Sequence, residues 1–345
     1  MEYKKPFRLK PGDLVGIVSP SWGGPEMFPH VYENGLNFLK SLGLKIQEYP
    51  GTRAKDDYIN ANPQARARDI NDAFADKAVK AIFTSIGGSD SIRILPYLNT
   101  SIIQQNPKII MGYSDTTTIL SYINQLGSVT FNGPSVMAGF SQANSLPAEF
   151  RQHIQEMLFS PADNYQYQEY GVYCDGYPDW GNMANIGKTK KTHKADGWRF
   201  IQGTGRVTGK LFGGCLEVLE FMNGTDYWPA RDFWNGKLLF LETSEEKPSI
   251  ERVHRMLRNY GMQGILGRIT AILFGRARDY NDEEKRQLEE SIVKVVKDEF
   301  GYPELPIITN MNFGHTDPQI ILPLGVSAEI DCVNTSFQLI EAPLL

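Results

Sequence analysis

The chain has 345 residues, enough for one large domain or two ordinary domains with a well-buried core. Hydrophobic residues make up 41% and charged residues 22%, and the formal net charge is −5, which argues against the basic surface of a nucleic-acid-binding protein. Because no apolar run reaches the length of a membrane span and no apolar segment follows the polar start, we expect a cytoplasmic protein that binds neither membranes nor nucleic-acid polymers.

Strand and helix patterns alternate through residues 1–160, which we expect to form an amino-terminal domain. The predicted elements are a strand and loop over 13–20, a helix over 27–42, a strand over 44–49, a helix over 63–75, a strand over 79–86, a helix over 90–98 and a strand over 108–111. Asn62 is the expected N-cap of the second helix, with Pro63 at its first position. This order predicts a mainly parallel sheet with helices on both faces.

Residues 161–205 lack a long apolar period and are predicted to form a long inter-domain loop. Such loops are usually functional or disordered, and the tryptophans at 180 and 198 favour function. Residues 206–345 are predicted to form a second α/β domain. Its expected elements are helices over 216–222, 249–260 and 282–300, strands over 236–243, 269–275 and 306–310, and short β segments from 319 to 345.

Cysteines and histidines give no sign of a metal site. Cys174, Cys215 and Cys332 are widely spaced and odd in number, and no C-x-x-C pair occurs. The five histidines form no H-E-x-x-H pattern. We therefore expect neither a disulfide framework nor a metal, and no cofactor.

Ser114 stands where an apolar strand pattern meets a helix start, in the run Lys108-Ile-Ile-Met-Gly-Tyr-Ser-Asp-Thr-Thr. A serine at a sharp strand-to-helix turn exposes its hydroxyl, and the amides of the following helix favour developing negative charge, as in α/β hydrolases. The motif differs from G-x-S-x-G, because Asp115 and Thr116 follow the serine. The same residues would also suit an ordinary helix N-cap, so the segment alone leaves both interpretations open.

A nucleophilic serine needs a base, and the base needs an acid that orients it. Among the histidines, only His315 closely follows a predicted strand and has a glycine before it, although a solvated or structurally bonded ring is the alternative. Glu242 ends an apolar strand at the sheet edge where active sites form, although a strand-end ion pair would also explain it. We prefer Glu242 to Glu245 and Glu246, because those two lie on the following loop.

An oxyanion hole needs two backbone donors near the nucleophile. The amide of Asp115 is one candidate, and the amide of Gly88 is the other, because glycine lets the backbone approach a reacting carbonyl closely. A plain strand-to-helix turn would also explain the glycine pair at 87 and 88. A phosphate-binding loop has no support, since neither G-x-G-x-x-G nor G-x-x-x-x-G-K-[ST] is present.

Six segments together resemble the LD-carboxypeptidase family, including its branch of microcin C self-immunity proteins. They are Gly16-Ile-Val-Ser-Pro, Ile86-Gly-Gly-Ser-Asp-Ser, Gly112-Tyr-Ser-Asp-Thr-Thr, Gly209-Lys-Leu-Phe-Gly-Gly-Cys-Leu-Glu, Leu241-Glu-Thr-Ser-Glu-Glu and Asn312-Phe-Gly-His-Thr. The resemblance implies that Ser114 is the nucleophile, His315 the base and Glu242 its orienting acid. It also implies a Rossmann-like amino-terminal domain packed on the second α/β domain, with the site between them, and a homodimer.

The resemblance implies a small peptide or aminoacyl-nucleotide substrate. Cell-wall members of the family remove a terminal D-alanine from a muropeptide, and their double-glycine turn typically continues Tyr-Gly. This chain continues Ser-Asp-Ser, which resembles the immunity branch, whose members cleave the amide between an aspartyl residue and a modified adenylate. On this basis Asp90 and Ser91 are predicted substrate-binding residues. A non-catalytic small-molecule binding protein on the same scaffold is a further alternative.

Trp180 is the third predicted substrate contact, because an indole face can stack on adenine. The run Asp179-Trp180-Gly181 is typical of a mobile loop tip, whereas Trp198 leads into a β segment and is expected to be packed. A hydrophobic anchor for the loop would explain Trp180 as well. The lysine-rich run over 188–194 could meet a phosphate, but a solvated loop explains it better.

Overall fold

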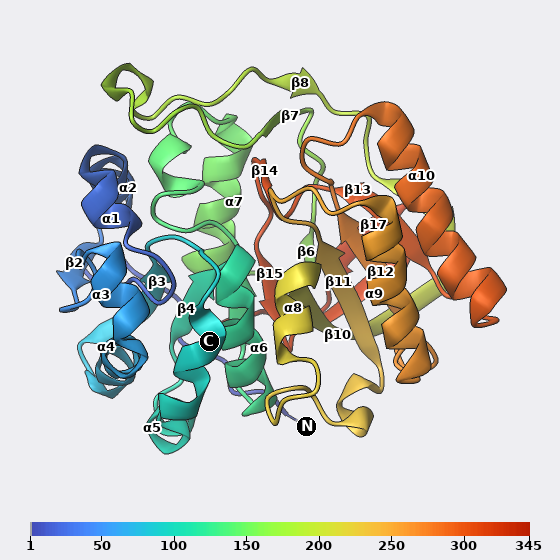
Figure 1. The fold of residues 1–345 in the computed structure, drawn as a ribbon, viewed down its shortest axis with the longest axis horizontal. Helices are drawn as coiled ribbons and strands as arrows, with labels where there is room; N and C mark the ends of the chain where they lie inside the picture. The colour runs from blue at the N-terminus through green and yellow to red at the C-terminus, as the bar shows by residue number, and fades with distance from the viewer. Residues whose placement is uncertain (1) are drawn as a thin grey trace.

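The computed structural model describes residues 2–345 and contains two main sheets that lie side by side (Figure 1). The amino-terminal sheet has six strands in the order β15-β5-β4-β3-β1-β2. Five of them pair in parallel, and β15 returns from near the carboxyl end of the chain to pair antiparallel with β5. The strands are β1 (Leu14–Val18), β2 (Lys45–Glu48), β3 (Val79–Thr84), β4 (Ile109–Gly112), β5 (Thr130–Asn132) and β15 (Leu322–Leu324).

Helices connect the parallel strands, as the predicted alternation requires. They are α1 (Gly24–Met27), α2 (Pro29–Ser41), α3 (Asp56–Ala61), α4 (Pro63–Ala75), α5 (Thr100–Gln105), α6 (Thr117–Gln125) and α7 (Ala148–Leu158), with 3₁₀ turns η1 (Ser91–Tyr97), η2 (Ser114–Thr116) and η3 (Phe140–Gln142). The predicted bounds of α4 are confirmed, and its apolar residues at helical spacing are buried. Asn62 occupies the N-cap position, but its side chain donates a hydrogen bond to the carbonyl of Tyr58.

The second sheet has eight strands in the order β6-β17-β16-β10-β11-β12-β13-β9. Its four central strands are parallel, and antiparallel strands flank them on both sides. The strands are β6 (Tyr165–Gln166), β9 (Arg199–Gln202), β10 (Arg206–Cys215), β11 (Lys237–Glu242), β12 (Ala271–Gly275), β13 (Ile307–Met311), β16 (Ser327–Asp331) and β17 (Ser336–Leu339). The helices are α8 (Leu216–Met222), α9 (Ile250–Met262) and α10 (Asp282–Val293), with a 3₁₀ turn η5 (Arg231–Trp234) and a π-helical turn η6 (Lys294–Glu299).

The long loop predicted over residues 161–205 contains four short strands and a 3₁₀ turn. This segment carries β6 and β9, which join opposite edges of the second sheet, and β7 (Val172–Asp175), which pairs with β14 (Thr316–Asp317) and with β8 (His193–Lys194). It also contains a short 3₁₀ turn, η4 (Met183–Asn185). Each strand has only two to four residues, too short for a clear alternation in the sequence. In Figure 1 the segment crosses the top of the molecule between the two sheets.

Two predicted helices differ from the observed ones. The helix expected over 90–98 is the 3₁₀ segment η1, which contains Pro96, a residue with no amide hydrogen for the helical ladder. The helix expected over 282–300 changes from α to π geometry after Val293. None of the helices in residues 2–345 is long and apolar enough to cross a membrane.

The two sheets are joined tightly where β10 meets the start of α6. The amide of Cys215 donates a hydrogen bond to Thr117 Oγ1 at 3.1 Å. A Cβ atom at Gly214 would lie 2.4 Å from Thr117 Cγ2, so only glycine permits this approach. The contact fixes α6, and with it the turn that carries Ser114, against the second domain.

Candidate active site

Ser114 lies in the sharp turn between β4 and α6, as the sequence predicts. Its φ angle is +58°, in the left-handed region that residues with a side chain rarely adopt, which costs on the order of 1–3 kcal/mol. Gly87 packs directly against it, and a Cβ atom there would lie 2.9 Å from Ser114 Cβ. The glycine at 87 therefore makes room for the exposed serine hydroxyl.

His315 and Glu242 complete a continuous chain of hydrogen bonds with this serine. The Nε2 atom of His315 lies 3.0 Å from Ser114 Oγ, and its Nδ1 atom lies 2.7 Å from Glu242 Oε2. Glu242 ends β11 and is fully buried, and His315 is 4% exposed. Because the carboxylate can only accept, Nδ1 carries a proton, which leaves Nε2 of a neutral ring free to accept the serine proton.

Gly314 explains why the histidine and the glutamate can meet. It has a φ angle of +94°, and a Cβ atom at this position would lie 2.6 Å from Glu242 Oε2. A side chain here would displace the carboxylate from the imidazole. The glycine before His315, noted from the sequence, is thus a steric requirement of the site.

A second carboxylate, Glu245, also reaches the histidine. Its Oε2 atom lies 2.9 Å from His315 Nε2, on the side of the ring that faces Ser114, and its side chain is about half exposed. Burial disfavours the imidazolium, but the carboxylates of Glu242 and Glu245 outweigh burial and raise the pKa of His315 to about 10. In return, the hydrogen bond from His315 lowers the pKa of Glu245 to about 2.

The buried Glu217 holds the loop that carries Glu245 through hydrogen bonds to Ser244. This carboxylate accepts hydrogen bonds from the backbone amide of Ser244 at 2.9 Å and from its hydroxyl at 2.8 Å. Burial raises the pKa of Glu217, and the nearby Glu242 raises it further. The position of Glu245 therefore depends on packing that no local sequence pattern reveals.

The two predicted backbone donors lie beside the serine. Gly88 and Ser114 line the same cavity, and the amide nitrogen of Asp115 directly follows the nucleophile. Within residues 2–345, neither the amide of Gly88 nor that of Asp115 donates a hydrogen bond to another group. Both amides are therefore free to donate to a ligand.

Asp90 and Ser91 do not line this cavity, contrary to their predicted role as substrate contacts. The carboxylate of Asp90 pairs with Arg66 at 2.9 Å and with Arg93 at 3.0 Å. The hydroxyl of Ser91 is buried and lies 2.5 Å from the carbonyl oxygen of Asp115. The backbone amides of both residues donate to the Asp115 carboxylate. These hydrogen bonds fix the position of the turn that contains Gly87 and Gly88.

The cavity in front of Ser114 has a volume of about 600 Å³, and its wall includes the aromatic side chains of Trp22, Phe28, Tyr113, Tyr177 and Trp180. Trp180 belongs to this wall, with its ring centroid 5.7 Å from that of Phe28 and 5.3 Å from that of Tyr177. Its carbonyl also accepts a hydrogen bond from His30 Nε2 at 2.6 Å. Trp180 thus anchors its loop and still presents its ring to the cavity.

Several cavity residues were missed by sequence reasoning. Tyr113 packs its ring 5.1 Å from the His315 ring, and its hydroxyl lies 2.7 Å from that of Tyr177. Arg278 adds a cation to the wall. Tyr113 adjoins Ser114 in sequence and could have been singled out, whereas Tyr177 and Arg278 come from separate loops. Trp198 is packed, as predicted, and donates to Asn312 Oδ1 at 2.7 Å.

A metal site would need a cluster of side chains that could bind the ion. Residues 2–345 contain no group of three or more His, Cys, Asp or Glu side chains placed to hold a metal ion. The three cysteines are free in the structure.

Comparison with known proteins matches the chain to one family over both domains. The model of the LD-carboxypeptidase N-terminal domain matches residues 15–133, and that of the LD-carboxypeptidase C-terminal domain matches residues 208–330. The chain is 29% identical to the Microcin C7 self-immunity protein MccF of Escherichia coli, over 96% of this chain and 94% of that protein. It is also 29% identical to a "Probable murein peptide carboxypeptidase" of Bacillus subtilis, over 95% and 91%.

A solved structure of MccF in complex with aspartyl sulfamoyl adenosine has the same fold. It superposes with a TM-score of 0.88 at 28% identity, over 99% of this chain and all of that one. The predicted two-domain α/β class and the resemblance drawn from six short segments are both confirmed. The chain belongs to the LD-carboxypeptidase family and is a serine-type hydrolase of that family.

Proposed function

We propose that this protein cleaves the amide between an acidic aminoacyl group, such as aspartyl, and a modified nucleotide. The observation that carries the proposal is the unbroken hydrogen-bond chain from Ser114 through His315 to Glu242, which opens onto a cavity walled by aromatic rings. These hydrogen-bonded side chains supply a nucleophile and its base. The Trp180 ring offers a face for a nucleobase. The likeness to MccF, whose solved complex holds aspartyl sulfamoyl adenosine, supports this substrate class.

The proposed reaction begins when Ser114 Oγ attacks the amide carbonyl carbon while His315 Nε2 takes its proton. The carbonyl oxygen gains the negative charge and receives hydrogen bonds from the free amides of Gly88 and Asp115. His315 then gives its proton to the departing nitrogen, which breaks the amide bond and leaves an acyl-serine. Water, deprotonated by the same ring, attacks the ester, releases the acid and restores the Ser114 hydroxyl.

A second candidate is the release of terminal D-alanine from muropeptides. Glu245 and Glu246 place two carboxylates on the cavity wall, which favours a substrate with a cationic amine. Arg278 on the same wall instead suits an acidic side chain. The sequence identity to the Bacillus subtilis "Probable murein peptide carboxypeptidase" equals the identity to MccF, at 29%. The muropeptide alternative therefore has comparable support.

Initial rates on two substrates separate these candidates. We expect purified protein to release aspartate from aspartyl sulfamoyl adenosine with a higher kcat/KM than it releases D-alanine from a muropeptide tetrapeptide. The reverse order would favour the cell-wall activity. Failure to hydrolyse either compound at any pH between 6 and 10 would reject the proposed reaction and favour a non-catalytic binding protein.

Trp180 provides a test of nucleotide recognition. We expect Trp180→Ala to raise KM for aspartyl sulfamoyl adenosine by about 5- to 150-fold, because stacking on an aromatic ring contributes about 1–3 kcal/mol per base. Trp180→Phe keeps a ring in the wall and should retain most of the affinity. An alanine variant with an unchanged KM and an intact fold would show that the ring only anchors its loop.

A further inference from the structure

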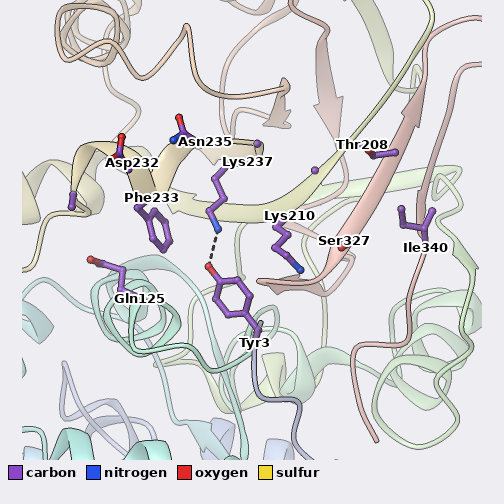
Figure 2. A pocket seen from close by; sticks show the side chains of 13 residues that line it. Tyr3, Gln125, Thr208, Lys210, Asp232, Phe233, Asn235, Lys237, Ser327 and Ile340 are labelled. Atoms are coloured by element: carbon purple, nitrogen blue, oxygen red, sulfur yellow. Dashed lines mark hydrogen bonds between the residues drawn. The ribbon is translucent and has the colours of Figure 1, made fainter. Parts of the chain in front are cut away.

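A second cavity lies at the opposite end of β11 from Glu242. It has a volume of about 720 Å³, and it is lined by Tyr3, Phe233 and two lysines, Lys210 and Lys237 (Figure 2). Lys237 begins β11, five residues before Glu242, which places the two roughly 17 Å apart along an extended strand. The proposed reaction uses no residue of this cavity.

Lys237 is a buried cation without a counter-ion. It is 5% exposed, and its ammonium donates to Tyr3 Oη at 2.7 Å while lying 4.2 Å from the ring centre of Phe233. Burial raises the pKa of Tyr3 to about 12, so this partner stays neutral. Within residues 2–345, no carboxylate lies within 4 Å of Lys237, and only one of its three ammonium hydrogens has a protein acceptor.

A second lysine reaches the same space. Lys210 pairs directly with Lys237 across the parallel strands β10 and β11, so both side chains leave the same face of the sheet. Figure 2 shows them pointing towards the ring of Tyr3. Lys210 Nζ is 3.7 Å from Glu341, but this carboxylate is already held by Lys5 at 2.6 Å. Burial, and then the charge of Lys210, lower the pKa of Lys237 to about 8.

The other buried lysine among residues 2–345 has hydrogen-bond acceptors within the protein. Lys108 is 8% exposed, and its ammonium donates to two backbone carbonyls, those of Ala73 and Asp76. It needs no external partner, because carbonyl oxygens replace the lost water. The ammonium of Lys237 instead contacts the neutral Tyr3 hydroxyl and the rings of Tyr3 and Phe233, and the residue lines an open cavity.

We propose that this second cavity binds a small anionic group, a carboxylate or a phosphate, against the ammonium groups of Lys210 and Lys237. An anion here would supply the acceptors that Lys237 lacks and would separate two cations that now face the same space. Thr208, Asn235 and Ser327 line the same cavity and offer polar side chains to the rest of the ligand. The inference does not depend on the proposed reaction.

Thermal unfolding in the presence of inorganic phosphate, and separately of acetate, tests the site. At saturating anion we expect the Tm of the wild-type protein to rise by about 2 °C or more above its value in chloride at equal ionic strength. A larger rise with phosphate would identify a phosphate ligand, and a larger rise with acetate a carboxylate. An equal response to chloride and to both anions would overturn the proposal.

Variants locate the effect. Lys237→Met should abolish the anion-dependent rise and, without anion, should be at least as stable as wild type, because it removes an unpaired buried charge at similar volume. Lys210→Met should reduce the rise and serves as the test if Lys237→Met does not fold. Lys108→Met is the matched control, which should lose stability but keep the response. A full anion response in both cavity variants would contradict the proposal.

Discussion

Ser114→Ala is expected to lower kcat for aspartyl sulfamoyl adenosine by at least about 10³-fold while leaving the fold intact. Without the hydroxyl no acyl-serine can form, and only the oxyanion donors and the binding energy of the cavity remain. The substitution also removes the contact at 3.0 Å with His315 but no buried packing of any size. Initial rates, together with circular dichroism and a thermal scan, measure both halves of the prediction.

Ser89→Ala is the matched control, because Ser89 lines the same cavity and makes no hydrogen bond to His315 among residues 2–345. It should change kcat/KM far less than Ser114→Ala. Turnover by Ser114→Ala within tenfold of wild type would exclude the serine as nucleophile and leave His315 to activate a water directly. Loss of turnover in both variants with folding preserved would point to a damaged cavity instead.

The three side chains of the proposed triad could be singled out from the sequence because each lies at the carboxyl end of a strand-like run. Ser114 follows β4 of the first sheet, whereas Glu242 ends β11 and His315 follows β13 of the second sheet. Parallel strands explain why Glu242 and His315 lie at one edge, and the packing of the two sheets brings Ser114 to them. The glycine at 314 supported the choice of His315, and the glycine pair at 87 and 88 suggested an oxyanion donor. In the structure Gly87 leaves room for Ser114, and Gly314 leaves room for Glu242.

What the sequence could not predict depends on contacts between distant loops. Asp90 and Ser91 look like ligand-binding residues in a Gly-Gly-Ser-Asp-Ser run, but Arg66 and Asp115 hold them behind the turn. The sequence places β15 among the short β segments of the second domain, whereas in the structure it pairs with β5 of the first sheet. In neither case does a local periodicity encode the partner, and propensity alone leaves it open.

Glu245 is the cavity residue whose contact with His315 is hardest to predict from the sequence. Three glutamates lie within five positions, and the strand pattern favours Glu242 as the partner of the histidine. The structure places Glu242 at Nδ1 and Glu245 at Nε2, so the ring is held between two carboxylates. An imidazolium held in this way cannot accept the proton of Ser114, so Glu245 must move away from Nε2 before the proposed attack.

Glu245→Gln is therefore expected to shift the acid limb of the pH profile of kcat/KM towards lower pH by about one unit or more. A carboxylate near the ring favours the protonated form, so its removal lowers the pKa of His315 from its raised value of about 10. The base must be neutral, so a lower pKa gives more active enzyme at any pH on the acid limb. Activity at neutral pH should rise by about tenfold or more, provided that substrate binding is unchanged.

Two further variants separate this effect from general changes in cavity charge. Glu246→Gln removes a neighbouring carboxylate that lines the same cavity but does not contact His315, so its acid limb should stay near that of wild type. Glu242→Gln should also lower the pKa of His315, yet it should reduce kcat by about 10⁴-fold, because the ring loses the partner that fixes its tautomer. Identical acid limbs for wild type and Glu245→Gln would mean that Glu245 does not hold the resting histidine in solution. A gain in activity only for Glu245→Gln would show that this carboxylate inhibits the resting enzyme and that a bound substrate has to displace it from His315.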